Sequence, residues 1–128
     1  MISNTRAYHK ALQARLKLWY DRMGLFEWRI TPYFVLERNG TTAGEIKVNL
    51  RYLRADLMLY PPIREYWDDR RWDLIDEALV HELCHILTDP LYEIAVDAIT
   101  NTSSQFLHTI REQQTQRIAQ IVLRRFEA

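Results

Sequence analysis

The chain of 128 residues contains little glycine, little proline and a single cysteine, Cys84. Three glycines and four prolines leave few places for turns, which favours long regular elements joined by short connections. One cysteine excludes an intramolecular disulfide and is typical of a protein from a reducing compartment. No internal repeat, low-complexity tract or linker divides the sequence, so we expect one domain over residues 1–128.

The sequence also lacks an excess of charge and a long apolar run. Seventeen basic and seventeen acidic side chains cancel, which argues against attraction of nucleic acid phosphates. The sequence contains no run of about eighteen apolar residues, so it predicts no membrane span. The first twenty residues mix charged and apolar positions, unlike a signal peptide. We therefore expect a soluble cytoplasmic protein without a nucleic acid or membrane partner, and the sequence leaves its oligomeric state open.

The first sixty residues predict a helix followed by three strands. Between residues 5 and 22, apolar residues recur at helical steps of four, four and three: Tyr8, Leu12, Leu16 and Trp19. Three runs rich in β-branched and aromatic residues then follow, at 28–38, 42–50 and 54–60. Asn39-Gly40 predicts a hairpin between the first two runs. We expect a three-stranded, mainly antiparallel sheet.

Helical periodicity returns after Pro62. Asp73 is a typical N-cap residue for a helix that Asp89-Pro90 is expected to end. A short helix is expected over residues 91–99, and "NTSS" at 101–104 supplies capping residues for a long C-terminal helix. The predicted order of helix, three strands and three helices is that of an α+β domain.

The segment His81-Glu82-Leu83-Cys84-His85 carries the clearest chemical pattern. Histidines four residues apart lie on one helix face, so both imidazoles can reach one metal ion. Glu82 points about a quarter-turn away, within reach of a water on that metal. Metal-assisted peptide hydrolysis requires such nitrogen ligands, an open position for water and a carboxylate that accepts its proton. The pattern therefore predicts a zinc site with His81 and His85 as ligands and Glu82 as the catalytic base.

A catalytic zinc ion needs a third protein ligand, and the sequence offers four candidates. They are Glu93, Asp97, His108 and Glu112. We favour Glu112, because it belongs to a stripe beside the apolar face of the C-terminal helix. The stripe consists of His108, Glu112, Thr115 and Ala119. Asp97 is alternatively a hydrogen-bond partner for a ligating histidine.

Two stretches, "LVHELCHILTDPL" and "HTIREQQTQRIAQIV", carry a resemblance to a known family. They resemble the small zincin-like metallopeptidases of phages and prophages, which are similar to minimal gluzincins. In that group the C-terminal helix carries a Glu-(Glu/Gln)-x-x-x-Arg-(Leu/Ile) pattern, and "EQQTQRI" at residues 112–118 matches it. The resemblance extends from Trp28 onward. It implies a zincin-like domain in which Glu112 is the third zinc ligand.

Glu93 remains the second choice within the same resemblance. Larger gluzincins place a glutamate ligand four residues before an aspartate, and Glu93 and Asp97 have this spacing. Glu93 follows His85 by only eight residues, however, whereas gluzincins usually leave a longer gap.

These features predict a zinc-dependent metallopeptidase that cleaves a peptide or protein substrate, with zinc-bound water activated by Glu82. Zincins commonly bind substrate along a sheet edge, which nominates residues 45–50 or 54–60. The alternative is a binding or regulatory protein that retains the zincin scaffold, with a structural or sensing zinc and little hydrolytic activity. A third reading is a metal-free helical interaction module. Cys84 is expected to be a core residue.

Overall fold

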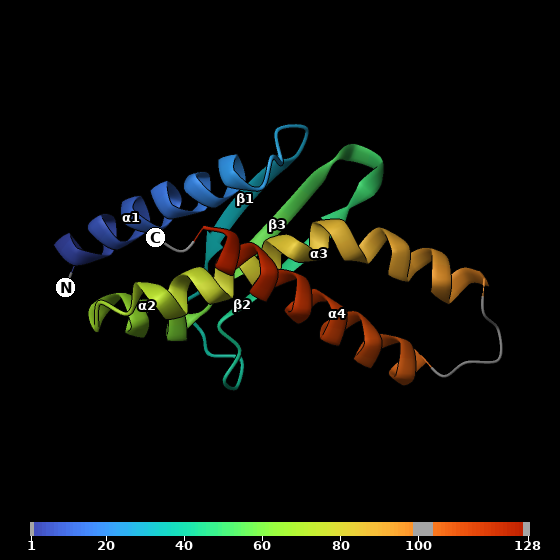
Figure 1. Ribbon diagram of the computed structural model, residues 1–128. Helices are drawn as coiled ribbons and strands as arrows, with labels where there is room; N and C mark the ends of the chain where they lie inside the picture. The colour runs from blue at the N-terminus through green and yellow to red at the C-terminus, as the bar shows by residue number, and fades with distance from the viewer. Residues whose placement is uncertain (1, 99–103, 127–128) are drawn as a thin grey trace.

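The computed structural model describes residues 2–98 and 104–126, and the side chains within residues 4–92 and 105–126. Figure 1 shows a three-stranded sheet with helices packed against it and the last two long helices side by side. The elements are α1 (Ile2–Arg22), β1 (Arg29–Phe34), β2 (Gly44–Asn49), the 3-10 turn η1 (Leu50–Tyr52), β3 (Arg54–Leu59), α2 (Pro61–Asp68), α3 (Trp72–Ala98) and α4 (Ser104–Arg125). The expected α+β class is confirmed.

The three expected strands form a sheet that is mixed and not mainly antiparallel, with strand order β1-β3-β2. β3 pairs in parallel with β1 and antiparallel with β2. The hairpin predicted at Asn39-Gly40 is wrong, because the strands on either side of it are not neighbours. Gly40 does adopt a turn conformation, with a φ of 59°. A turn residue fixes only the local backbone, however, and β3 is central because its side chains Ala55, Leu57 and Leu59 are the deeply buried ones.

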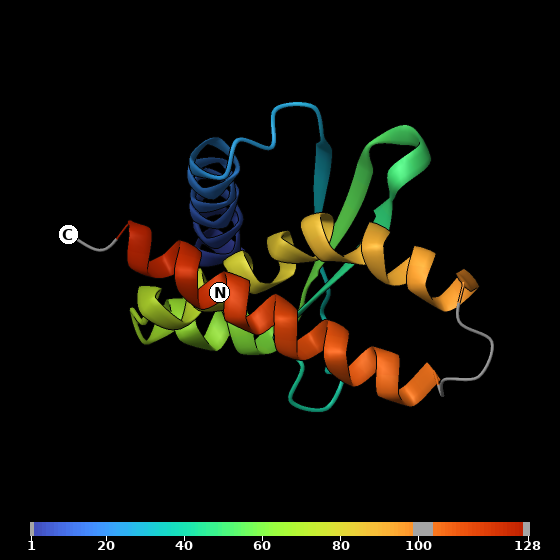
Figure 2. The ribbon, with the colours of Figure 1, turned by 45° about the vertical axis from the view of Figure 1, so that its right-hand side comes forward.

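The hydrophobic core forms between the apolar face of the sheet and the helices. Its fully buried large residues come from α1, β3, α2 and α3: Leu12, Leu57, Ile63, Ile75, Leu79, Val80 and Leu83. In Figure 2, α3 and α4 cross in front of the sheet. No helix in the described ranges is both long and apolar enough to cross a membrane.

The helix that carries the two histidines is longer than the sequence predicts. α3 continues through Pro90 to Ala98, so the expected stop at Asp89-Pro90 is wrong, and the short helix expected from residue 91 is its last part. Residue 99 lies outside the described residues. Proline removes one helical hydrogen bond, but α3 packs along α4, and Tyr92, beyond the proline, lies against the Arg111 guanidinium of α4. The hydroxyls of Thr88 and Thr115 form a buried hydrogen bond of 2.9 Å between the two helices.

The short helix α2 was not predicted. The sequence predicts a return to helical periodicity only after Pro62, whereas Pro61 and Pro62 themselves occupy the first helical turn of α2. The missing N–H of proline costs nothing there, because the first amides of a helix have no intrahelical acceptor. α2 thereby returns the chain from β3 to the start of α3.

One partly buried carboxylate, Asp76, joins α1 to the first turns of α3. Asp76 accepts hydrogen bonds from Arg15 Nε at 2.6 Å, from Arg15 Nη2 at 2.5 Å and from the Trp19 indole N–H at 2.9 Å. The side chain of Asp76 is 14% exposed, and that of Arg15 is 32% exposed. This contact fixes the orientation of the histidine-bearing helix relative to α1.

Candidate metal centre

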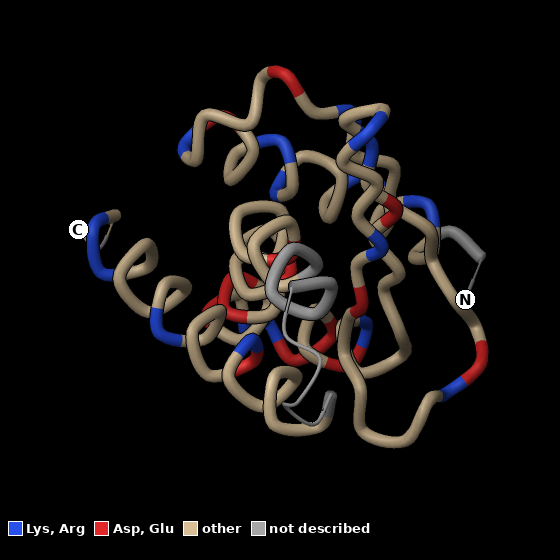
Figure 3. The backbone as a smooth tube through the Cα atoms, turned by 90° about the vertical axis from the view of Figure 1, so that its right-hand side faces the viewer, with Lys and Arg blue, Asp and Glu red and all other residues tan. Residues whose placement is uncertain are grey.

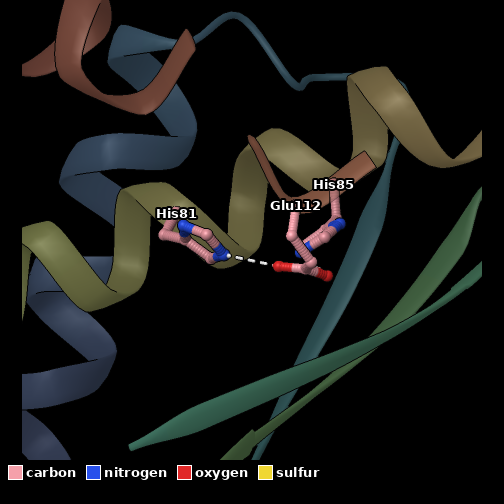
Figure 4. Close-up of side chains that lie close together, drawn as sticks. All are labelled: His81, His85 and Glu112. Atoms are coloured by element: carbon pink, nitrogen blue, oxygen red, sulfur yellow. Dashed lines mark hydrogen bonds and ion pairs between the residues drawn. The ribbon is translucent and has the colours of Figure 1, made fainter. Parts of the chain in front are cut away.

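Three of the predicted site residues converge between α3 and α4. His81 and His85 project from one face of α3, with ring centroids 5.2 Å apart, and Glu112 faces them from α4 (Figure 4). The Glu112 carboxylate lies 3.3 Å from His81 Nε2 through Oε2 and 3.5 Å from His85 Nε2 through Oε1. One ligand atom from each residue lies within 4.8 Å of the others, so the cluster can hold a metal ion.

In each imidazole ring, the Nδ1 atom faces a hydrogen-bond acceptor from another side chain. His81 Nδ1 lies 2.6 Å from Gln116 Oε1, and His85 Nδ1 lies 2.8 Å from Asp89 Oδ1. A neutral imidazole that donates through Nδ1 carries its lone pair on Nε2. The lone pairs of both rings therefore point toward Glu112, which is the tautomer and orientation that a metal requires.

His85 is buried in a surrounding of carboxylates. Burial lowers the pKa of its imidazole, but the hydrogen bond to Asp89 and the charges of Asp89, Glu82 and Glu112 outweigh burial, so the net pKa is raised. A proton therefore competes with a metal ion for this ring, and metal binding is expected to release it.

Glu82 lies beside the three converging side chains, with Oε2 3.9 Å from His81 Nε2. Its side chain is 13% exposed, and burial raises its carboxyl pKa from 4.5 to about 7. The charge of His85 and a hydrogen bond from the Ile46 backbone oppose this rise, whereas Glu112 adds to it. A carboxyl with such a pKa can accept and release a proton near neutral pH.

A cleft of about 540 Å³ opens in front of these residues, bordered by the start of β2, by α3 and by α4. β2 is an edge strand, whereas β3 is central. Of the two segments nominated as a substrate-binding edge, 45–50 borders the cleft, through residues 45 and 46, and no residue of 54–60 lines it.

The cleft is acidic although the chain as a whole is neutral. Figure 3 shows acidic segments gathered near the middle of the view, where α3 and α4 lie side by side. The carboxylates that line the cleft are Glu45, Glu77, Glu82, Asp89 and Glu112. Among the described residues of its lining, Arg111 is the only arginine or lysine. Such an excess of negative charge favours a bound cation.

No protein-family model, curated protein or solved structure matches the chain. The cluster of His81, His85 and Glu112 is compatible with a zincin-like site.

The other candidate ligands are placed differently. His108 also lines the cleft, but it lies outside the three-residue cluster, and its Nδ1 accepts a hydrogen bond of 3.1 Å from Arg111 Nη2. The side chains of Glu93 and Asp97 lie outside the described residues. Their backbones belong to α3 itself, and the helical rise places that of Glu93 about 12 Å beyond His85 along the axis.

Cys84 is fully buried in the hydrophobic core, as expected. Burial raises the pKa of its thiol to about 12. The side chain therefore remains a neutral thiol near neutral pH and acts as a small apolar residue between the two histidines.

Sequence patterns did not identify four residues that contact the predicted site residues: Gly44, Asp89, Arg111 and Gln116. Two of them carried a signal, because Asp89 follows His85 by four residues and Gln116 follows Glu112 by four. Residues at this spacing lie on one helix face. The sequence pattern instead predicts that Asp89 ends the helix and that Asp97 is the hydrogen-bond partner of a histidine. The contacts of Gly44 and Arg111 depend on tertiary packing, which no local pattern displays.

Proposed function

We propose that this chain is a zinc-dependent metallopeptidase in which His81, His85 and Glu112 hold the metal. The observation that carries the proposal is the convergence of two imidazole Nε2 atoms on one carboxylate, with each Nδ1 held by an acceptor. Two imidazoles and one glutamate form a known ligand set of catalytic zinc, in which the fourth position stays open for water. The buried Glu82 beside the cluster favours a catalytic zinc over a structural one.

Zinc held by these three residues would lower the pKa of a bound water and polarise the carbonyl of the scissile bond. Glu82 supplies the proton transfers. Its carboxylate accepts a proton from the attacking water and donates it to the amine nitrogen as the C–N bond breaks.

The edge strand β2 supports an extended peptide as the substrate. In the described part of the chain β2 pairs with β3 on one side only, and its residues 44–46 border the cleft. An extended peptide can add to such an edge through main-chain hydrogen bonds. Glu82 also accepts a hydrogen bond from the Ile46 backbone in this strand. The proposed catalytic carboxylate and the proposed substrate edge are therefore in direct contact.

Substitution Glu82→Gln tests this function. We expect the variant to keep the fold and the bound zinc but to lose at least about 100-fold in peptide hydrolysis, because the amide cannot accept the proton. Zinc content, circular dichroism and cleavage of a fluorogenic peptide library give the three readouts. Unchanged cleavage by Glu82→Gln contradicts the mechanism. Stoichiometric zinc in a wild-type protein that cleaves no peptide favours a binding or regulatory protein instead.

A further inference from the structure

Arg111 contacts the candidate metal centre from two sides. Its Nη2 donates a hydrogen bond of 3.1 Å to Oε1 of Glu112, and the same nitrogen lies 3.1 Å from Nδ1 of His108. Its Nε lies 3.9 Å from Oδ1 of Asp89, the carboxylate that holds His85. The guanidinium carbon lies 4.7 Å from the centre of the Tyr92 ring. Arg111 thus contacts both Glu112, the third candidate ligand, and Asp89, the hydrogen-bond acceptor of His85.

The placement of Arg111 is not explained by hydrogen bonding alone. Its side chain is 22% exposed, and its Nε is buried without a hydrogen-bond partner among the described residues. A buried donor without an acceptor is unfavourable, so such groups are rare in folded proteins. The guanidinium is held here by charge and by the face of an aromatic ring.

The two oxygens of Glu112 have different surroundings. Oε1 accepts the hydrogen bond from Arg111 and lies 3.5 Å from His85 Nε2, whereas Oε2 lies 3.3 Å from His81 Nε2. A guanidinium and a metal ion repel each other, and sharing one oxygen would bring them closest together. Oε2 is therefore the oxygen that a metal ion can approach at the lower electrostatic cost.

We propose that Arg111 is a positioning residue. Its hydrogen bond keeps Oε1 of Glu112 away from the metal, so that the metal is bound through Oε2 alone. This inference rests on the proposed function. Ligation by one oxygen gives three protein ligand atoms, so that one water completes a four-coordinate site, whereas ligation by both oxygens beside that water would raise the coordination number to five. Arg111 thereby sets the coordination number of the metal without touching the substrate.

Cobalt substitution tests the proposal without relying on activity. Four-coordinate Co²⁺ absorbs visible light several-fold more strongly than five- or six-coordinate Co²⁺, so the spectrum reports the number of ligands. The neutral variants Arg111→Met and Arg111→Gln remove the guanidinium that donates to Oε1 of Glu112. The control is Arg124→Gln, at an exposed position of the same helix. We expect intense bands in the wild type and the control. In both Arg111 variants the bands should weaken several-fold, with one Co²⁺ per chain retained.

The remaining outcomes separate this proposal from the proposed function. Bands of wild-type intensity in the Arg111 variants would overturn the role of Arg111 and leave the metal centre intact. Loss of Co²⁺ from both variants with unchanged circular dichroism would also overturn it, because Arg111 would then be needed for binding itself. If Arg111→Met does not fold, the polar Arg111→Gln carries the comparison. A wild-type chain that binds neither Co²⁺ nor Zn²⁺ refutes the metal centre.

Discussion

Gly44 lies directly against the side chain of Glu82. A Cβ atom at Gly44 would lie 3.3 Å from Cγ of Glu82 and 3.5 Å from the carbonyl oxygen of Met58. Gly44 has no positive φ, so its backbone could accommodate any residue. The constraint is therefore the close approach of β2 to the helix at the position of the proposed catalytic base.

Substitution Gly44→Ala is expected to lower peptide hydrolysis by about tenfold while zinc content stays unchanged. The added methyl group displaces the Glu82 carboxylate by a few tenths of an ångström, and small misplacements of a catalytic group are costly. The measurement is kcat/KM together with zinc content. Lys47→Ala, at an exposed position of the same strand, is the matched control. Wild-type activity in Gly44→Ala would show that this contact does not position Glu82.

Glu82 should make the stability of the metal-free protein depend on pH. Its pKa rises from 4.5 to about 7 on folding, so the folded state binds more protons than the unfolded state between these values. Stability therefore falls as the pH rises through this range. The full penalty, about 3 kcal/mol, applies above pH 7.

Glu82→Gln should remove this penalty. With metal removed by a chelator, we expect urea unfolding at pH 8 to show the variant more stable than the wild type by up to about 3 kcal/mol. The difference should shrink toward zero as the pH falls to 4.5. Glu77→Gln, an exposed carboxylate on the same helix, controls for the loss of one charge. A difference that does not change with pH would contradict the assignment.

The residues that the sequence identified are those whose spacing carries the information. His81 and His85 repeat at the helical period, and Glu112 falls on the inward stripe of a second long helix, so their convergence follows once the helices pack. The alternation of apolar and polar residues likewise predicts three strands. Local patterns are sufficient for these features.

The features that the sequence did not identify depend on contacts between distant segments. The parallel pairing of β1 with β3 follows from the burial of β3, which overrides the turn signal at Gly40. The passage of α3 through Pro90 depends on α4, which packs beside it. Gly44 and Arg111 acquire their roles only because β2 and α4 approach the histidine helix.

Asp89→Ala is expected to lower zinc affinity by about 10- to 100-fold, because His85 loses the acceptor that fixes its ring and its proton. Asp89→Asn keeps an acceptor oxygen and should show a smaller loss. Competition with a chromophoric chelator measures both affinities. Gln116→Ala offers the matching test for His81. Equal affinity in the wild type and Asp89→Ala would mean that His85 is oriented by packing alone.

Asp76→Ala is expected to destabilise the protein by roughly 3 kcal/mol, the lower end of the range for breaking a buried ion pair, because Arg15 is partly exposed. The variant also leaves the Trp19 indole N–H without its acceptor. Chemical denaturation measures the change. Asp21→Ala, which breaks the exposed pair with Lys17 on α1, should cost less than about 1 kcal/mol. Similar losses in the two variants would show that Asp76 does not anchor α1 to α3.

The most direct test of the metal centre is the zinc content of three proteins purified side by side: the wild type, Glu112→Ala and Glu93→Ala. We expect one zinc ion per chain in the wild type and in Glu93→Ala, and loss of tightly bound zinc in Glu112→Ala. Among the side chains that the structure describes, Glu112 is the carboxylate that faces both histidine Nε2 atoms. Full zinc retention by Glu112→Ala, or a wild type that binds no zinc, would contradict the proposed site.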